Sequence, residues 1–350
     1  MSRRPFRHVL SYAAASLALS VAVGALPAAP AAGAAEVTAT ANGHALPAEY
    51  VVSTEPGVHP EGIAIHHDGT MYVSSDSTGR LYRGDVRTST LAPFAAAGTT
   101  ERGTSLGVHT DDVGRVWSVG GSQLLVHDRD GGLVAARTAA GGPLAPSRLN
   151  DLVLTPTAVY VTDWANPVVY RASVEGDAIG ELEPWLDIRP ALSWFPAQYW
   201  LLNGIVADPA GRVLLVASNG TEAVWRVDTL TRHVEMVDLG GQSFGADGMQ
   251  VRGDTLYAVL NYGAPSGVYI ARLDRGWRSG AVEHVVLADG HGKAFALPTT
   301  LAVFQCRVYV VNSQLDDPVG VPPFTVSTVE DPTCGSGGDE PGQAVSGATG

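Results

Sequence analysis

One pattern recurs six times along this chain: a short apolar run, a tight turn, a second apolar run that ends in small polar residues, and usually a third apolar run. The runs are rich in Val, Tyr and Trp and are bounded by Gly, Asp or Pro, which predicts strands joined by hairpins. The repeats begin at residues 61, 106, 150, 203, 247 and 299. A period of about 45 residues suits a blade of four strands. The sequence therefore predicts an all-β, six-bladed β-propeller around a central tunnel.

The N-terminal region indicates export. Arg3, Arg4 and Arg7 precede a stretch rich in Ala, Leu and Val, and small residues follow, which is the pattern of a signal peptide. The adjacent arginines resemble a twin-arginine signal, and an ordinary secretory signal is the alternative. We expect a secreted, extracellular protein without a permanent membrane anchor. The expected divisions are the signal peptide at residues 1–34, a linker at 35–48, the propeller at 49–334 and a disordered tail at 335–350.

Two features are expected to fasten the ends of the propeller. Residues 50–53, which precede the first repeat, are expected to pair with the last blade and close the ring. Cys306 and Cys334 are the only two cysteines. In an exported protein they can form a disulfide that holds the C-terminal segment to the last blade, and two unrelated thiols are the alternative. Two cysteines so spaced do not indicate a zinc or redox site.

Charge restricts the possible partners. The formal net charge is −13 and no Lys/Arg cluster follows Arg7, so we do not expect a nucleic-acid-binding protein. Strong acidity is compatible with export or with the acceptance of cations. We expect a monomer that acts on a small molecule.

Polar side chains recur at one position of the repeat. In a propeller the first strand of each blade is innermost, and its opening residue is expected at the top of the tunnel. Strands normally disfavour Asn, Asp and Glu, and buried carboxylates are costly unless they are paired or bound to a metal. The six opening residues are Glu61, Leu106, Asn150, Asn203, Asp247 and Thr299.

Four of these residues, Glu61, Asn150, Asn203 and Asp247, offer oxygen ligands and are predicted to bind a divalent metal. Such ligands favour hard cations, calcium first and magnesium next, with Mn²⁺ and Zn²⁺ as further alternatives. Four protein oxygens leave calcium positions open for water or substrate, as Lewis-acid catalysis requires. The alternative is that Asn150, Asn203 and Asp247 are turn residues. Recurrence in four blades favours the metal site.

The order of these opening motifs resembles that of gluconolactonase and regucalcin (senescence marker protein) propellers, and more distantly paraoxonase and diisopropyl fluorophosphatase. The resemblance covers about residues 55–315. It implies that Glu61, Asn203 and Asp247 bind the metal, that Arg148 and Asn150 contact the substrate, and that Asp247 is also a general base or nucleophile. The motifs that carry it are Pro60-Glu61-Gly62, Arg148-Leu149-Asn150-Asp151, Leu202-Asn203-Gly204 and Ala246-Asp247-Gly248.

The chain departs from the family pattern near blade four. The family usually has an Asp at the end of this blade's second strand, where this chain has Asn219. The loop before blade four is long and aromatic, and its Trp194 and Tyr199 are predicted to contact the substrate as part of a lid or pocket wall. Packing between blades is the alternative for this loop. His109, in the first strand of blade two, either faces the tunnel as a proton shuttle or is an ordinary histidine.

The sequence thus predicts an exported metal-dependent hydrolase, most consistent with a lactonase that uses the cation as Lewis acid and Asp247 as base. One alternative is a non-catalytic, calcium-stabilised propeller that binds a ligand or cell-surface component. Another is a metal-free propeller of the strictosidine-synthase or lyase kind.

Overall fold

The regular secondary structure of the described residues consists almost entirely of strands. The computed structural model describes residues 46–94, 103–192, 201–261 and 265–335, and the chain divides into Met1–Gly43 and His44–Gly350, of which the second unit holds all the described structure. Its only helix is one 3₁₀ turn, η1 (Arg189–Leu192), and no helix in these ranges could cross a membrane. The expected signal peptide, almost all of the expected linker and tail, Trp194 and Tyr199 lie outside the described residues.

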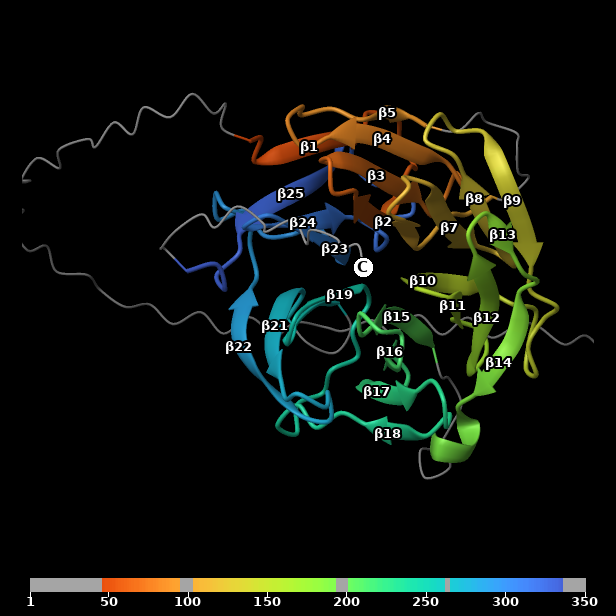
Figure 1. Ribbon diagram of the computed structural model, residues 1–350. Coiled ribbons are helices and arrows are strands. Elements are labelled where there is room, and N and C mark those ends of the chain that lie inside the picture. Colours follow the sequence, from red (N-terminus) through yellow and green to blue (C-terminus); the bar gives the residue numbers. More distant parts are fainter. Residues whose placement is uncertain (1–45, 95–102, 193–200, 262–264, 336–350) are drawn as a thin grey trace, which may run out of the picture. The chain divides into compact units, whose positions relative to one another are not determined.

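The strands form six antiparallel sheets around a central axis, which confirms the predicted six-bladed propeller (Figure 1). Blade one contains β2 (Pro60–Ile65), β3 (Thr70–Ser75), β4 (Leu81–Asp85) and β5 (Ala92–Pro93), and blade two contains β6 (Val108–Thr110), β7 (Val116–Gly120), β8 (Gln123–His127) and β9 (Leu133–Thr138). Blade three contains β10 (Leu149–Thr155), β11 (Ala158–Asp163), β12 (Val168–Glu175), β13 (Ala178–Ile179) and β14 (Glu183–Asp187).

Blade four contains β15 (Leu202–Ala207), β16 (Val213–Ser218), β17 (Ala223–Asp228) and β18 (Val234–Met236). Blade five contains β19 (Met249–Arg252), β20 (Thr255–Leu260), β21 (Gly267–Leu273) and β22 (Gly280–Val286). Blade six contains β23 (Pro298–Phe304), β24 (Arg307–Asn312), β25 (Phe324–Glu330) and, as its outermost strand, β1 (Glu49–Ser53).

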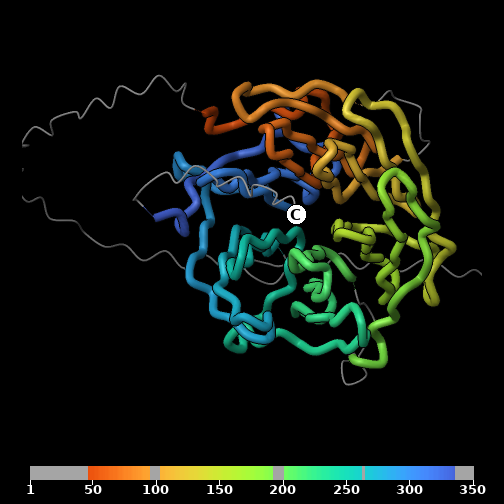
Figure 2. The backbone as a smooth tube through the Cα atoms, in the orientation of Figure 1, coloured from red at the N-terminus to blue at the C-terminus, as the bar shows by residue number. Residues whose placement is uncertain are grey.

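Strand β1 closes the ring. It pairs antiparallel with β25, with Tyr50 opposite Val326, so the first described strand completes the last blade (Figure 2). The Tyr50 hydroxyl also donates a hydrogen bond of 2.6 Å to the carbonyl oxygen of Val86, which follows β4 of blade one. The expected pairing of residues 50–53 with the last blade is confirmed.

The hydrophobic core lies between neighbouring blades. Between blades three and four, for example, Tyr160 and Val169 pack in one cluster with Leu214 and Trp225, all of them at most 5% exposed. Alternate residues of each strand face opposite sides of the sheet, and both sides are covered by the adjacent blades. This explains why the second strands are buried along almost their whole length, including the small polar residues at their ends.

Each innermost strand carries a β-bulge at its opening residues. In blade one, Pro60 pairs with Ser75 and Ile63 pairs with Val73, so β2 has one extra residue over this stretch. The same irregularity occurs at the start of β10, β15 and β23. In blades two and five the two opening residues share one partner on the second strand. A bulge redirects side chains, and here the same device repeats in every blade.

Hydrogen bonds to the backbone carbonyl oxygens of the six opening residues, which we call the carbonyl ring, link every blade to the next. The donor comes from the preceding blade and is either a glycine N–H or a Ser/Thr hydroxyl. The bonds run from Ser74 Oγ to Leu106, from Gly107 N to Asn150 (2.7 Å), from Thr162 Oγ1 to Asn203 (2.8 Å), from Gly204 N to Asp247 (2.8 Å), from Gly248 N to Thr299 (2.8 Å) and from Thr299 Oγ1 to Glu61 (2.8 Å).

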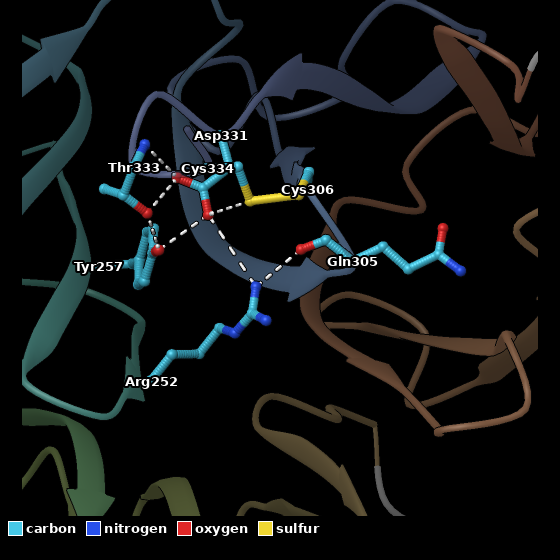
Figure 3. Close-up of a disulfide and its surroundings, with 7 residues drawn as sticks. All are labelled: Arg252, Tyr257, Gln305, Cys306, Asp331, Thr333 and Cys334. Carbon is cyan, nitrogen blue, oxygen red and sulfur yellow. Dashed lines mark hydrogen bonds and ion pairs between the residues drawn. A yellow bond between two sulfur atoms is a disulfide. The ribbon is translucent and has the colours of Figure 1, made fainter. Parts of the chain in front are cut away.

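A disulfide between Cys306 and Cys334 fastens the segment after β25 (Figure 3). Beside it, Asp331 is buried, and its carboxylate accepts a hydrogen bond of 2.8 Å from the Tyr257 hydroxyl of blade five. Arg252 Nη1 lies 4.0 Å from the same carboxylate oxygen. The C-terminal segment is therefore held to blades five and six together.

The carbonyl ring predicts that Gly204→Ala is destabilising. A Cβ at this position would lie 2.3 Å from the carbonyl oxygen of Asp247, a backbone atom that has little freedom to move. Overpacking of this kind costs about 1–3 kcal/mol, and urea unfolding should show a loss in that range. Gly103→Ala is the control, because its Cβ would have no neighbour within 4 Å. Equal stability of the two variants would contradict the packing argument.

Candidate functional site

The tunnel holds a cavity of about 230 Å³ that is lined by the innermost strands of all six blades. Glu61, Asn150, Asn203 and Asp247 all line it, each from a different blade. Their exposed fractions are only 4–7%. The structure thus brings the four sequence-predicted ligands to one cavity, while their role as ligands stays a prediction.

Blades two and six contribute differently. Gly107 and Thr300 line the cavity there, rather than the opening residues Leu106 and Thr299. The Thr299 hydroxyl instead donates to the carbonyl oxygen of Glu61, as part of the carbonyl ring. The oxygen-bearing opening side chains therefore belong to blades one, three, four and five.

The cavity concentrates negative charge. Three carboxylic acids, Glu61, Asp151 and Asp247, line it, and no Lys or Arg of the described chain does. Burial raises the pKa of Asp247 to about 7, against hydrogen bonds from Asn261 and Asn203 that lower it. Burial, and then the charge of Asp247, raise the pKa of Glu61 well above its ordinary value. Without a cation, these groups hold their protons to a higher pH than ordinary carboxylic acids do.

Sequence reasoning did not assign a site role to Asp151. Burial raises the pKa of Asp151 to about 7, although its carboxylate accepts hydrogen bonds from the backbone N–H groups of Leu152 (2.8 Å) and Ile205 (3.2 Å). Its Oδ1 lies 3.8 Å from Nε2 of His109, which also lines the cavity. Asn150 and Asp151 are adjacent in the sequence, but only the fold shows that the Asp151 carboxylate lies between the Ile205 N–H of blade four and His109 of blade two.

His109 faces the tunnel, the first of the two alternatives considered for it. Enclosure in the tunnel lowers the pKa of His109 to about 4, so the imidazole is neutral at neutral pH. A neutral imidazole can accept a proton or a hydrogen bond, but a shuttle role for His109 stays a prediction.

Arg148 lies outside the cavity. It is exposed, and its guanidinium stacks over the ring of Trp164 at 4.8 Å from the ring centroid. Its backbone N–H donates to Asp163 Oδ1 (3.0 Å) and its carbonyl accepts from Trp164 N (2.8 Å), which ties it to the end of β11. The chain thus carries a positively charged side chain, that of Arg148, two residues before Asn150. The other predicted substrate contacts, Trp194 and Tyr199, lie outside the described residues.

The donor set fits a hard divalent cation. It offers two carboxylates and two amide oxygens and no sulfur, which suits calcium or magnesium. Within the described residues, no three His, Cys, Asp or Glu side chains gather as a metal site, so the amides Asn150 and Asn203 are essential to this set. No Arg or Lys side chain of the described residues lines the cavity to neutralise the buried carboxylates. A bound cation would neutralise them instead.

Comparisons with known proteins support the fold. A family model described as strictosidine synthase-like, N-terminal, matches residues 48–84, which include Glu61. No curated protein sequence matches the chain significantly. The resemblance to gluconolactonase and regucalcin is not specifically supported by these comparisons and stays a prediction.

Among solved structures, the chain resembles a streptogramin B lyase (TM-score 0.55, 14% identity, covering 75% of this chain and 79% of that chain). It also resembles virginiamycin B lyase from Staphylococcus aureus (TM-score 0.53, 14%, 75% and 80%) and the Malassezia sympodialis allergen Mala s 1 (TM-score 0.58, 15%, 81% and 96%). At these identities the likeness shows the fold alone.

The buried carboxylates predict a specific pH dependence of the metal-free protein. Because Asp151 and Asp247 have raised pKa values in the folded chain, the unfolded chain loses these protons first as the pH rises from about 4 to about 7. The free energy of unfolding, measured by urea titration with a chelator present, should therefore fall over this range. Asp247→Asn should flatten the fall, and Asp254→Asn, at an exposed position, should not. If the free energy of unfolding of Asp247→Asn fell with pH as steeply as that of wild type, the raised pKa assigned to Asp247 would be wrong.

Proposed function

We propose that this chain is an exported, metal-dependent hydrolase of the lactonase type, with calcium as the first candidate for its cation. The observation that carries the proposal is the cavity lined by Glu61, Asn150, Asn203 and Asp247, with no Lys or Arg of the described residues in its lining. These buried oxygen donors would serve as ligands of a hard cation. The volume of about 230 Å³ suits a small ring rather than a large ligand.

The reaction would be ring opening of a lactone by water. When bound, the cation supplies Lewis-acid polarisation of the substrate carbonyl. Asp247 takes a proton from water as its oxygen forms a bond to the carbonyl carbon. The ring C–O bond then breaks, and Asp247 returns the proton to the leaving oxygen, which gives a hydroxy acid.

Arg148 is the proposed anchor for the substrate outside the reacting ring. Stacking on Trp164 restricts the guanidinium, while its exposed position leaves N–H groups available. A guanidinium donates well to carboxylate, phosphate or hydroxyl oxygens, so an oxygen-rich lactone is the favoured substrate class. Asn150 would contact the substrate from inside the cavity.

A second candidate is a metal-free propeller of the strictosidine synthase-like kind. The family match to residues 48–84 favours it. In that case Glu61 and Asp247 would act in their protonated or hydrogen-bonded forms, and divalent ions would not bind in the tunnel. Measurement of ion binding therefore separates the two candidates before any substrate is known.

The test is an assay of a lactone panel with the mature chain in calcium, in excess chelator, and in the Asp247→Ala variant. We expect hydrolysis only by the wild-type protein with calcium, with a loss of at least about 100-fold in the variant, a typical contribution of a general base. Asp254→Ala is the matched control, since it removes an exposed carboxylate that pairs with Arg272.

Equal hydrolysis in all arms would overturn the proposal. If calcium raises the melting temperature but no lactone or ester is turned over, the result favours the non-catalytic, calcium-stabilised propeller. If calorimetry shows no binding of any divalent ion, the metal-free candidate takes its place.

A further inference from the structure

Two asparagines occupy the ends of the second strands in blades four and five, directly behind two of the proposed ligands. Asn219 follows β16, and Asn261 follows β20. Neither lines the cavity. Each makes a side-chain hydrogen bond to the opening residue of its own blade, Asn203 or Asp247.

The orientation of Asn219 is fixed by its backbone partners. Its Nδ2 donates to the carbonyl oxygens of Gly245 (2.9 Å) and Ala246 (3.2 Å), so its Oδ1 must be the atom that faces Asn203. That oxygen accepts a hydrogen bond of 2.7 Å from Asn203 Nδ2. Because the Asn203 amide nitrogen is thereby held toward Asn219, its Oδ1 is the atom left for a cation.

Asn261 is fixed in a similar way. Its Nδ2 donates to Asp247 Oδ2 (2.5 Å) and to the carbonyl oxygen of Pro298 (2.8 Å). The opposite amide orientation would set an oxygen against both acceptors. The observed orientation leaves Asn261 Oδ1 buried without a hydrogen-bond partner among the described residues. A buried oxygen without a hydrogen-bond partner is unfavourable, and this orientation nevertheless keeps both hydrogen bonds that Asn261 donates to Asp247 and Pro298.

We propose that Asn219 and Asn261 are positioning residues that orient the ligand oxygens of Asn203 and Asp247 toward a divalent cation in the tunnel. This inference rests on the cation site of the proposed function. Asn219 supplies the acceptor oxygen for the Asn203 amide. Its amide nitrogen donates to the carbonyl oxygens of Gly245 and Ala246, directly before Asp247. One side chain is therefore hydrogen-bonded to Asn203 and to the backbone that precedes Asp247.

The test measures calcium binding by isothermal titration calorimetry and melting temperature in chelator, both with the full mature chain. Asn219→Leu and Asn261→Leu keep the shape of the side chain and remove its hydrogen bonds. We expect each to weaken calcium binding about 10–100-fold, the usual effect of losing an outer partner of a metal ligand. Asn219→Asp keeps the acceptor for Asn203 but loses the donor to the carbonyl oxygens of Gly245 and Ala246, so we expect it to bind calcium more tightly than Asn219→Leu and more weakly than wild type.

Asn312 supplies the matched control. It ends β24, the second strand of blade six, and it is buried and donates to Thr325 Oγ1 (3.1 Å) and Ser327 Oγ (2.9 Å). Blade six provides no proposed ligand. Asn312→Leu should therefore lower the melting temperature in chelator as much as the other variants do, with calcium affinity within about twofold of wild type.

The outcomes separate this inference from the proposed function. Wild-type calcium affinity in Asn219→Leu and Asn261→Leu, or an equal loss in Asn312→Leu, would overturn the positioning role alone. Absence of calcium, magnesium, manganese and zinc binding to the wild-type chain would overturn both. If either leucine variant does not fold, Asn219→Ser and Asn261→Ser are measured against Asn312→Ser with the same expectations.

Discussion

The carbonyl ring is the constraint on which the rest of the tunnel depends. Each opening residue directs its backbone carbonyl oxygen to a donor on the preceding blade, so the ring joins all six blades at one level. Because the carbonyl oxygen of each opening residue is bonded to the preceding blade, the side chain is the part of the residue that can reach the cavity. The chemistry of the tunnel is therefore set by side-chain identity, while the backbone is shared by all blades. This explains how Leu106 and Asp247 can occupy equivalent positions with no change in the ring.

The electrostatics of the cavity follow from this geometry. The blades hold the carboxylates of Glu61 and Asp247 in one enclosed space, where burial raises their pKa values. The interblade packing fixes their positions, so the cavity cannot relax by letting either side chain reach solvent. Only protons, hydrogen bonds or a cation can compensate. The amides on blades three and four add neutral oxygen donors, which suit a cation better than a proton.

The fold could be predicted from the sequence because it depends on periodicity. Six repeats gave the blade number, and the opening residues were found because they recur at one point of the pattern. The closing strand at Tyr50 was expected for the same reason. The surroundings of the site depend instead on which residues meet across blades. The contact of Asp151 with the Ile205 N–H, and the direction of the Asn219 amide, join residues that no local pattern relates.

The order of blades around the axis gives the cavity an asymmetry. In a ring of six, blade one lies opposite blade four, so Glu61 faces the group formed by Asn150, Asn203 and Asp247 on three consecutive blades. The two blades that flank Glu61 present no oxygen ligand from their opening residues, since Leu106 is apolar and the Thr299 hydroxyl is engaged within the carbonyl ring. The opening residues of blades two and six thus offer no oxygen ligand on either side of Glu61, although His109 of blade two also lines the cavity. Because blade five is next to blade six, Asp247 lies beside one of these two sides, and the proposed substrate would meet its proposed base there.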